Sequence, residues 1–351
     1  MKNNLTCMNL SGTVGEILAA NERVWIHQLL EDNPGLFDGF LAQSDEKIFR
    51  TMWHGEFPGK LLTGIAQTYL LRNDAQTKAV GERMVALFRQ AQEPCGYLGP
   101  WPEHVRFDKD LPSCFDTEIW GKWDTWGQYH CIYGLYRWYQ VTANPEALAI
   151  AVKALDHIYA YFIEGKKSFA DQKWAECNFA VGHAFALFYE ETGDERYLRA
   201  AEYIVKQDWK TQYFDFYTKS VLACDWLDAA LEGVPFYASN QPRWESLYSL
   251  ETLAVLYRIT GEAVYKDAMD SLWWGMVRTD RHNTGSFGTG EGATGNPYGA
   301  GSETCNTVAW MAFSTDYLKL TGKACVADEL ELSLYGKPPL LYTSTISDGR
   351  F

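Results

Sequence analysis

The residues best suited to chemistry lie in a glycine-rich segment, TGSFGTGEGATGNPYGAGSETCNTVAW, at 284–310. Its two carboxylates are Glu291 and Glu303, and Cys305 lies two residues after the second. A carboxylic acid in a partly dry cleft can protonate the oxygen of a leaving glycoside. Glu-x-Cys spacing can also offer an oxygen and a thiolate to zinc, but a structural zinc site needs four ligands. These residues alone therefore favour an acidic loop with a buried thiol.

A second candidate stretch is WDTWGQYHCIYGL at 123–135, which opens a predicted helix. Trp126 and His130 crowd its start together with other aromatic residues. A lone histidine in such a place is more often a structural residue than a catalyst. The neighbouring tryptophans favour a contact with sugar, because a ring presents a large amphipathic surface.

A third candidate is Glu56, which lies just before Pro58 and Gly59 in TMWHGEFPGKLLTGI. A carboxylate near a helix start is favourable for electrostatic reasons alone. The functional alternative is a carboxylate that accepts hydrogen bonds from sugar hydroxyls. The sequence supports these two interpretations of Glu56 equally.

The elements that must position these residues are revealed by a repeated phrase, found at 135–158, 187–205, 253–273 and 314–336, with a weaker copy at 65–90. Each of the four stronger copies has an apolar helix, a break at Thr-Gly or Thr-Ala, and a second helix with alanine in one face. Apolar residues recur at three- and four-residue steps within each arm. The phrase predicts helical hairpins.

The breaks carry the residues that end one helix and start the next. Gly193, Gly261 and Gly322 stand where a left-handed residue is needed to stop a helix, and the Ala143–Pro145 stretch is expected to make the break by another route. Asp194 and Asn144 are suited to cap the helices that follow.

Five such hairpins and an N-terminal helix near 12–31 predict an all-α fold, an (α/α)6 toroid of the six-hairpin glycosidase type. Long connections at 93–125 and 279–302 favour a closed ring with elaborate loops on one mouth, and no strand pattern is expected before residue 336. Residues 1–336 are expected to be the catalytic domain and 337–351 a truncated linker.

Composition excludes several classes of function. A net charge of −14 repels phosphate backbones and argues against a nucleic-acid partner. The sequence contains no apolar run of about eighteen residues, so we expect no membrane span. The N-terminus lacks the pattern of a secretory signal. We expect a cytoplasmic protein, and most of its eight widely spaced cysteines are expected to be buried thiols.

The phrase GSETCNTVAWMAFSTDYLKLTGKACVADELELSLYG, together with FPGKLL, CGYLGPW and WGQYHCIYGLYRWYQVTANPEALAIA, resembles the β-L-arabinofuranosidase-like glycoside hydrolases of family 127. The resemblance covers most of the chain. It implies an (α/α)6 barrel followed by β-sandwich domains, and a retaining glycosidase with a zinc-bound cysteine as nucleophile.

By position, the resemblance implies that Glu303 and Cys305 bind zinc, that Glu291 is the acid/base and that His130 contacts sugar. The sequence departs from the family where a downstream cysteine pair belongs, since only Cys325 follows Cys305. We also expect the C-terminal β-domains of the family to be absent from this sequence. We therefore expect either part of a longer protein or a chain without the zinc–cysteine chemistry. Two sugar-binding histidines of the family are replaced by Asn178 and Pro242.

The leading hypothesis is a glycoside hydrolase that removes non-reducing-end sugars from oligosaccharides, with Glu291 as acid/base, Trp126, His130 and Glu56 at the substrate, and zinc as cofactor. The alternative is a non-catalytic carbohydrate-binding scaffold. A third candidate is another α-toroid enzyme, such as an unsaturated glucuronyl hydrolase or a sugar epimerase. It ranks last because it does not explain the Glu-Thr-Cys phrase.

Overall fold

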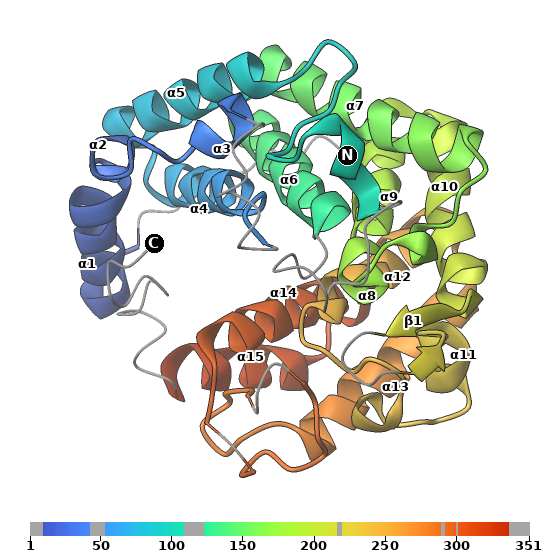
Figure 1. Ribbon diagram of the computed structural model, residues 1–351. Helices are drawn as coiled ribbons and strands as arrows, with labels where there is room; N and C mark the ends of the chain where they lie inside the picture. Colours follow the sequence, from blue (N-terminus) through green and yellow to red (C-terminus); the bar gives the residue numbers. More distant parts are fainter. Residues whose placement is uncertain are drawn as a thin grey trace. The chain divides into compact units, whose positions relative to one another are not determined.

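The computed structural model describes residues 10–42, 53–108, 123–215, 220–288, 292–299 and 301–336, and its regular secondary structure is almost entirely helical (Figure 1). The predicted all-α class is confirmed. The chain divides into two compact units, Met1–Trp174 and Ala175–Phe351.

The first unit contains two of the predicted hairpins. The inner pair of helices, α4 and α6, pack side by side, and α5 and α7 contact each other as their hairpin partners (Figure 1). Its elements are α1 (Gly12–Asn21), the π-helical η1 (Glu22–Ile26), α2 (Leu29–Asp32), α3 (Asp38–Leu41), α4 (Phe57–Arg72), α5 (Ala75–Ala91), η3 (Glu103–Asp108), α6 (Asp124–Thr142), α7 (Pro145–Tyr159), η4 (Ala160–Glu164) and η5 (Phe169–Asp171).

The second unit contains the other three hairpins. Helix α12 packs between α9 and α14, and each of these helices contacts its own hairpin partner. Its elements are α8 (Ala175–Asn178), α9 (Val181–Thr192), α10 (Glu195–Lys206), η6 (Asp208–Lys210), β1 (Tyr213–Asp215), β2 (Ser220–Leu222), α11 (Trp226–Leu231), η7 (Phe236–Ala238), α12 (Ser246–Thr260), α13 (Ala263–Thr279), α14 (Thr304–Thr321) and α15 (Ala324–Gly336).

The helix stops follow the predicted chemistry, with one difference. Gly193, Gly261 and Gly322 end α9, α12 and α14 in the left-handed region. Ala143 was expected to break its helix by another route, but it adopts the same conformation, with φ of +58°. Alanine pays a steric cost there that glycine avoids.

The threonine of each break explains why the phrase repeats. The hydroxyl of Thr192 donates to the Phe188 carbonyl, 2.6 Å away, and accepts from the Asp194 backbone nitrogen at 3.2 Å. The same pair of bonds is made by threonines 142, 260 and 321. One side chain therefore satisfies an orphan carbonyl of the old helix and fixes the chain entering the new one.

The following helices are capped as the sequence predicted. The Asn144 carboxamide oxygen accepts from the backbone nitrogens of Glu146 and Ala147 at 2.9 and 3.2 Å. The Asp194 carboxylate accepts from the Arg196 nitrogen at 2.9 Å. Each hairpin is thus specified by residues within a few positions of its turn.

Two details differ from the sequence-based expectations. The helix expected near 12–31 is divided into α1, η1 and α2. A short antiparallel pair, β1 and β2, joins Tyr213 to Leu222 where no strand was expected, because three-residue strands leave too little periodicity to recognise. Within the described part of the chain, no helix is long and apolar enough to cross a membrane.

Candidate active site

Two glycines set the geometry of the candidate residues in the first unit. A Cβ on Gly59 of α4 would collide with the backbone of His130 and Cys131, and a Cβ on Gly134 of α6 would collide with the Gly59 carbonyl. The backbones of α4 and α6 therefore cross in direct contact, which glycine alone permits. This crossing brings the start of α4, with Glu56, against the start of α6.

Glu56 lies in a network with two neighbours. The indole nitrogen of Trp126 donates to Glu56 Oε2, and Lys60 Nζ lies 2.8 Å from Glu56 Oε1. The same ammonium lies 5.3 Å from the centre of the Trp126 ring. Trp126 is 1% exposed, so its ring is packed within the unit rather than presented at a surface. Glu56 makes no side-chain cap to α4.

His130 lies edge-on to Trp126, with ring centroids 4.4 Å apart. Burial, with a smaller contribution from Lys60, lowers the pKa of His130 well below its usual value. The imidazole is therefore neutral at physiological pH, with one donor and one acceptor nitrogen. A neutral imidazole of this kind suits hydrogen bonding to a hydroxyl better than proton transfer from a charged state.

In the second unit, Glu303 and Cys305 lie together at the start of α14. The Cys305 thiol donates to Glu303, with 2.7 Å between Sγ and Oε1, and the Glu303 carbonyl accepts from the Thr307 hydroxyl at 3.1 Å. Cys305 is exposed, so the buried thiol favoured from the residues alone is wrong. The reason is that Cys305 occupies the first turn of a helix that follows an open loop.

These two side chains fit zinc as part of a ligand set. Two ligands of one tetrahedral zinc lie about 3.6 Å apart for ordinary Zn–S and Zn–O bonds, so Sγ and Oε1 must separate by about 1 Å. Side-chain rotation of an exposed cysteine can supply that change. Of the three-ligand groups that the described residues form, neither includes Glu303 or Cys305. Among the described residues, the candidate zinc site therefore has two ligands, Glu303 and Cys305.

The loop that carries Glu291 is fixed on both sides, although Glu291 itself lies outside the described residues. Gly288 pairs with Ser302, and its carbonyl accepts from the Trp244 indole at 3.0 Å. Gly292 pairs with Arg243, and the Ala293 nitrogen donates to the Pro242 carbonyl at 2.7 Å. One framework thus holds the two ends of this loop and the residue before Glu303.

The sequence-based reasoning missed a buried carboxylate beside this framework. Glu176 of α8 is 1% exposed, and its Oε1 lies 4.0 Å from Arg243 Nε. Burial raises the pKa of Glu176 to about 7, against a smaller lowering by Arg243. A carboxyl group that titrates near neutral pH is typical of functional sites. The available signal was a single acidic residue in the otherwise apolar and small stretch WAECNFA.

The structure thus brings together Glu56, Trp126 and His130 in one unit, and Glu303 with Cys305 in the other. Of the two positions where the resemblance implied lost histidines, Pro242 contributes its carbonyl to the framework and Asn178 is fully buried.

Comparison with known proteins assigns the fold and family. The β-L-arabinofuranosidase, GH127 catalytic domain family matches residues 30–339. A non-reducing end β-L-arabinofuranosidase of Bifidobacterium longum subsp. longum is 28% identical, over 79% of this chain and 44% of that protein.

Two solved structures share the fold over 94% of this chain at 21% identity. They are Ara127N-Se, a GH127 β-L-arabinofuranosidase from Geobacillus stearothermophilus T6, with a TM-score of 0.71, and the GH127 β-arabinofuranosidase BT3674, with 0.72. The chain covers 55% and 53% of them, so it spans about half the length of the relatives it matches. This likeness is consistent with the predicted α/α toroid, and the chain belongs to the β-L-arabinofuranosidase GH127 catalytic-domain family.

Proposed function

We propose that this chain carries the catalytic site of a retaining glycoside hydrolase that removes non-reducing-end, β-L-arabinofuranose-like sugars from an oligosaccharide or glycoside. The observation that carries the proposal is the contact between Glu303 and Cys305 at the start of α14, directly after a glycine-rich loop fixed at both ends. Family membership supports the same reaction class. We place the site within residues 1–336.

In this proposal Glu291 donates a proton to the leaving-group oxygen as the anomeric carbon passes from that oxygen to an enzyme nucleophile. Glu291 then takes a proton from the water that displaces the nucleophile and releases the sugar. Glu303 and Cys305 would hold zinc, and a bound zinc would supply the charge that keeps a coordinating thiolate ionised at neutral pH. Neutral His130 and the carboxylate of Glu56 bind sugar hydroxyls, and Trp126 holds Glu56 in place through its indole nitrogen.

The decisive experiment is turnover of aryl glycosides, aryl β-L-arabinofuranoside among them, by Glu291→Gln. Loss of the general acid is expected to lower kcat by roughly 10²–10⁴ while the chain stays folded. Glu331→Gln, on the exposed face of α15, is the matched control and should leave turnover unchanged. Equal turnover in the two variants would contradict the role of Glu291.

The zinc assignment has its own measurement, the zinc content per chain of Cys305→Ser. Removal of a thiolate ligand is expected to remove the zinc bound at Glu303, because one carboxylate alone holds the ion weakly. Cys325→Ser in α15 serves as the cysteine control and should keep it. Equal zinc content in both variants argues against this site.

The second candidate is a non-catalytic carbohydrate-binding scaffold, which the incomplete zinc ligand set among the described residues favours. A folded chain that binds the oligosaccharide and contains no zinc, with no turnover of any aryl glycoside, would support it over the hydrolase.

A further inference from the structure

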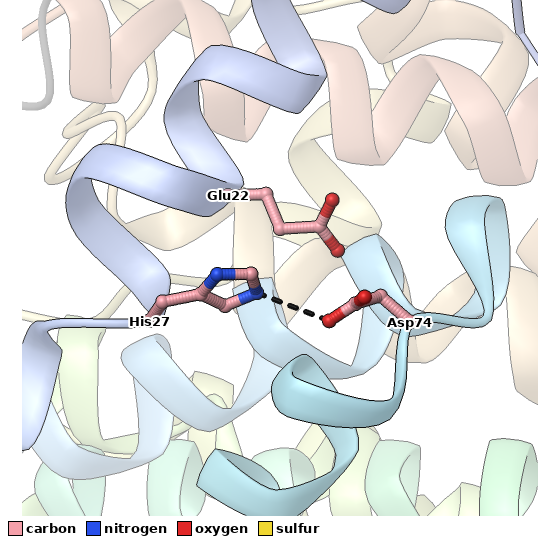
Figure 2. Close-up of side chains that lie close together, drawn as sticks. All are labelled: Glu22, His27 and Asp74. Atoms are coloured by element: carbon pink, nitrogen blue, oxygen red, sulfur yellow. Dashed lines mark hydrogen bonds and ion pairs between the residues drawn. The ribbon is translucent and has the colours of Figure 1, made fainter.

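Two clusters in the described residues bring together one histidine and two carboxylates, and they differ in how their oxygens are used. Figure 2 shows the first, Glu22, His27 and Asp74 in the first unit, with His27 directed at Asp74. Both Glu22 oxygens accept hydrogen bonds, from Thr77 Oγ1 at 2.7 Å and from Arg72 Nε at 2.6 Å. Asp74 caps α5 by accepting from the Thr77 nitrogen. This cluster is a satisfied structural network.

The second cluster joins three neighbouring helices of the second unit. His183 comes from α9, Glu251 from α12 and Asp316 from α14, and one potential ligand atom of each lies within 4.8 Å of the other two. His183 Nδ1 is 3.4 Å from Glu251 Oε2, and the side chains of both residues are less than 5% exposed. The Asp316 side chain is 14% exposed.

Glu251 is the member of this cluster with a buried oxygen that helix packing leaves without a partner among the described residues. Its Oε1 is buried and accepts no hydrogen bond within the described structure. Burial, and then the charge of Asp316, raise the pKa of Glu251 well above its usual value, while Lys319 acts in the opposite direction. The Lys319 ammonium contacts Asp316 Oδ1 at 2.8 Å and is itself mostly exposed. A buried carboxylate thus lies beside a second carboxylate, and the buried base that pairs with it is the imidazole of His183.

Helices α9 and α12 approach each other closely at the level of this cluster. Gly182, next to His183, lies so near α12 that an added Cβ would meet Thr252 Oγ1 at 3.3 Å. The Thr252 hydroxyl is also buried and makes no hydrogen bond in the described structure. Two adjacent residues of α12, Glu251 and Thr252, therefore each have a buried side-chain oxygen without a partner in the described structure, although native proteins normally satisfy such atoms.

We propose that His183, Glu251 and Asp316 form a divalent metal site that ties α9, α12 and α14 together. One imidazole nitrogen and two carboxylates are a donor set suited to Mn²⁺ or Zn²⁺, with water in the remaining positions. The site is separate from Glu303 and Cys305, because Asp316 follows Glu303 by thirteen positions, which correspond to about 20 Å along α14. Its role is structural and does not depend on the proposed function.

The experiment is a Mn²⁺ titration of the chelator-treated full chain, followed by electron paramagnetic resonance, in about 0.15 M NaCl to screen exposed acidic groups. Mn²⁺ is the probe because it prefers oxygen and imidazole ligands to thiolates. We expect one tightly bound ion per chain and a higher unfolding temperature in its presence, since a ligand of the folded state stabilises it. Cys305→Ser should bind in the same way.

The variants Glu251→Gln and Asp316→Asn are each expected to weaken Mn²⁺ binding at least tenfold. Asp74→Asn removes a carboxylate from the satisfied cluster of Figure 2 and should leave the affinity unchanged. If Glu251→Gln fails to fold, Asp316→Asn decides, because Asp316 is partly exposed and pairs with a surface lysine. The proposal is overturned if the wild-type chain binds no Mn²⁺ or Zn²⁺, or if the folded variants bind Mn²⁺ as tightly as wild type.

Discussion

At the scale of the residue, three buried glutamates show how different surroundings give one side chain different properties. Glu56 lies between Lys60 and the Trp126 indole, so its charge is compensated. Glu176 has only a distant arginine, and burial raises its pKa to about 7. Burial, and then the charge of Asp316, raise the pKa of Glu251 well above its usual value. The two with raised pKa values are the ones to probe by pH.

The pKa of Glu176 has a direct consequence for stability. Between about pH 4.5 and 7 the folded chain holds a proton on Glu176 that the unfolded chain has lost, so this residue lowers the free energy of unfolding as pH rises. The full effect is about 3 kcal/mol above pH 7. Glu176→Gln should therefore gain stability relative to wild type across this range, as measured by urea unfolding at a series of pH values.

The control for this prediction is Glu331→Gln, whose carboxylate is exposed, and whose stability difference from wild type should not change with pH. A difference between Glu176→Gln and wild type that is the same at pH 4.5 and at pH 7.5 would show that Glu176 titrates normally.

At the scale of the element, the hairpins depend on a few positions where backbone conformation limits the choice of residue. Gly193 has φ of +72°, yet its hypothetical Cβ would meet no atom within 4 Å. Gly275, in the interior of α13, is equally open but has ordinary helical geometry. Because neither position has a steric obstacle to a Cβ, a comparison of alanine substitutions at the two glycines isolates the effect of backbone conformation.

We expect Gly193→Ala to lower the free energy of unfolding by about 1–2 kcal/mol, because a Cβ is unfavourable in the left-handed region. Gly275→Ala should raise it by about 0.5–1 kcal/mol, because alanine reduces the entropy of the unfolded chain and favours helix. Urea denaturation of both variants measures the two effects, and changes of the same sign would contradict this account of the hairpin stop.

At the scale of the whole molecule, the net charge of −14 acts on any charged substrate that approaches. If the proposed hydrolase activity holds, we expect kcat/KM for an oligosaccharide containing uronic acids to rise severalfold as NaCl increases from about 10 to 150 mM, because salt screens the repulsion. A neutral arabinoside of the same length should show little change. An equal rise for both substrates would mean that salt acts on the protein rather than on the encounter.

Several features of this protein were determined by the sequence itself. The five hairpins, their left-handed stops and their caps at Asn144 and Asp194 were predictable, because each depends on residues within one or two helical turns of the break. The proximity of Glu303 and Cys305 was predictable too, because the two residues are only two positions apart at the start of one helix. Ala143 was misinterpreted because its left-handed conformation has no side-chain signature.

Only the tertiary structure decided which polar side chains are buried and with what partners. Glu176 meets Arg243 from sixty-seven positions away, and His183 meets Glu251 and Asp316 from two other helices. Such contacts depend on which helices pack together, as α12 does with α9 and α14 in the second unit. Local pattern specifies an element's start and end, whereas desolvation and charge pairing are set by distant segments that no spacing along the chain records.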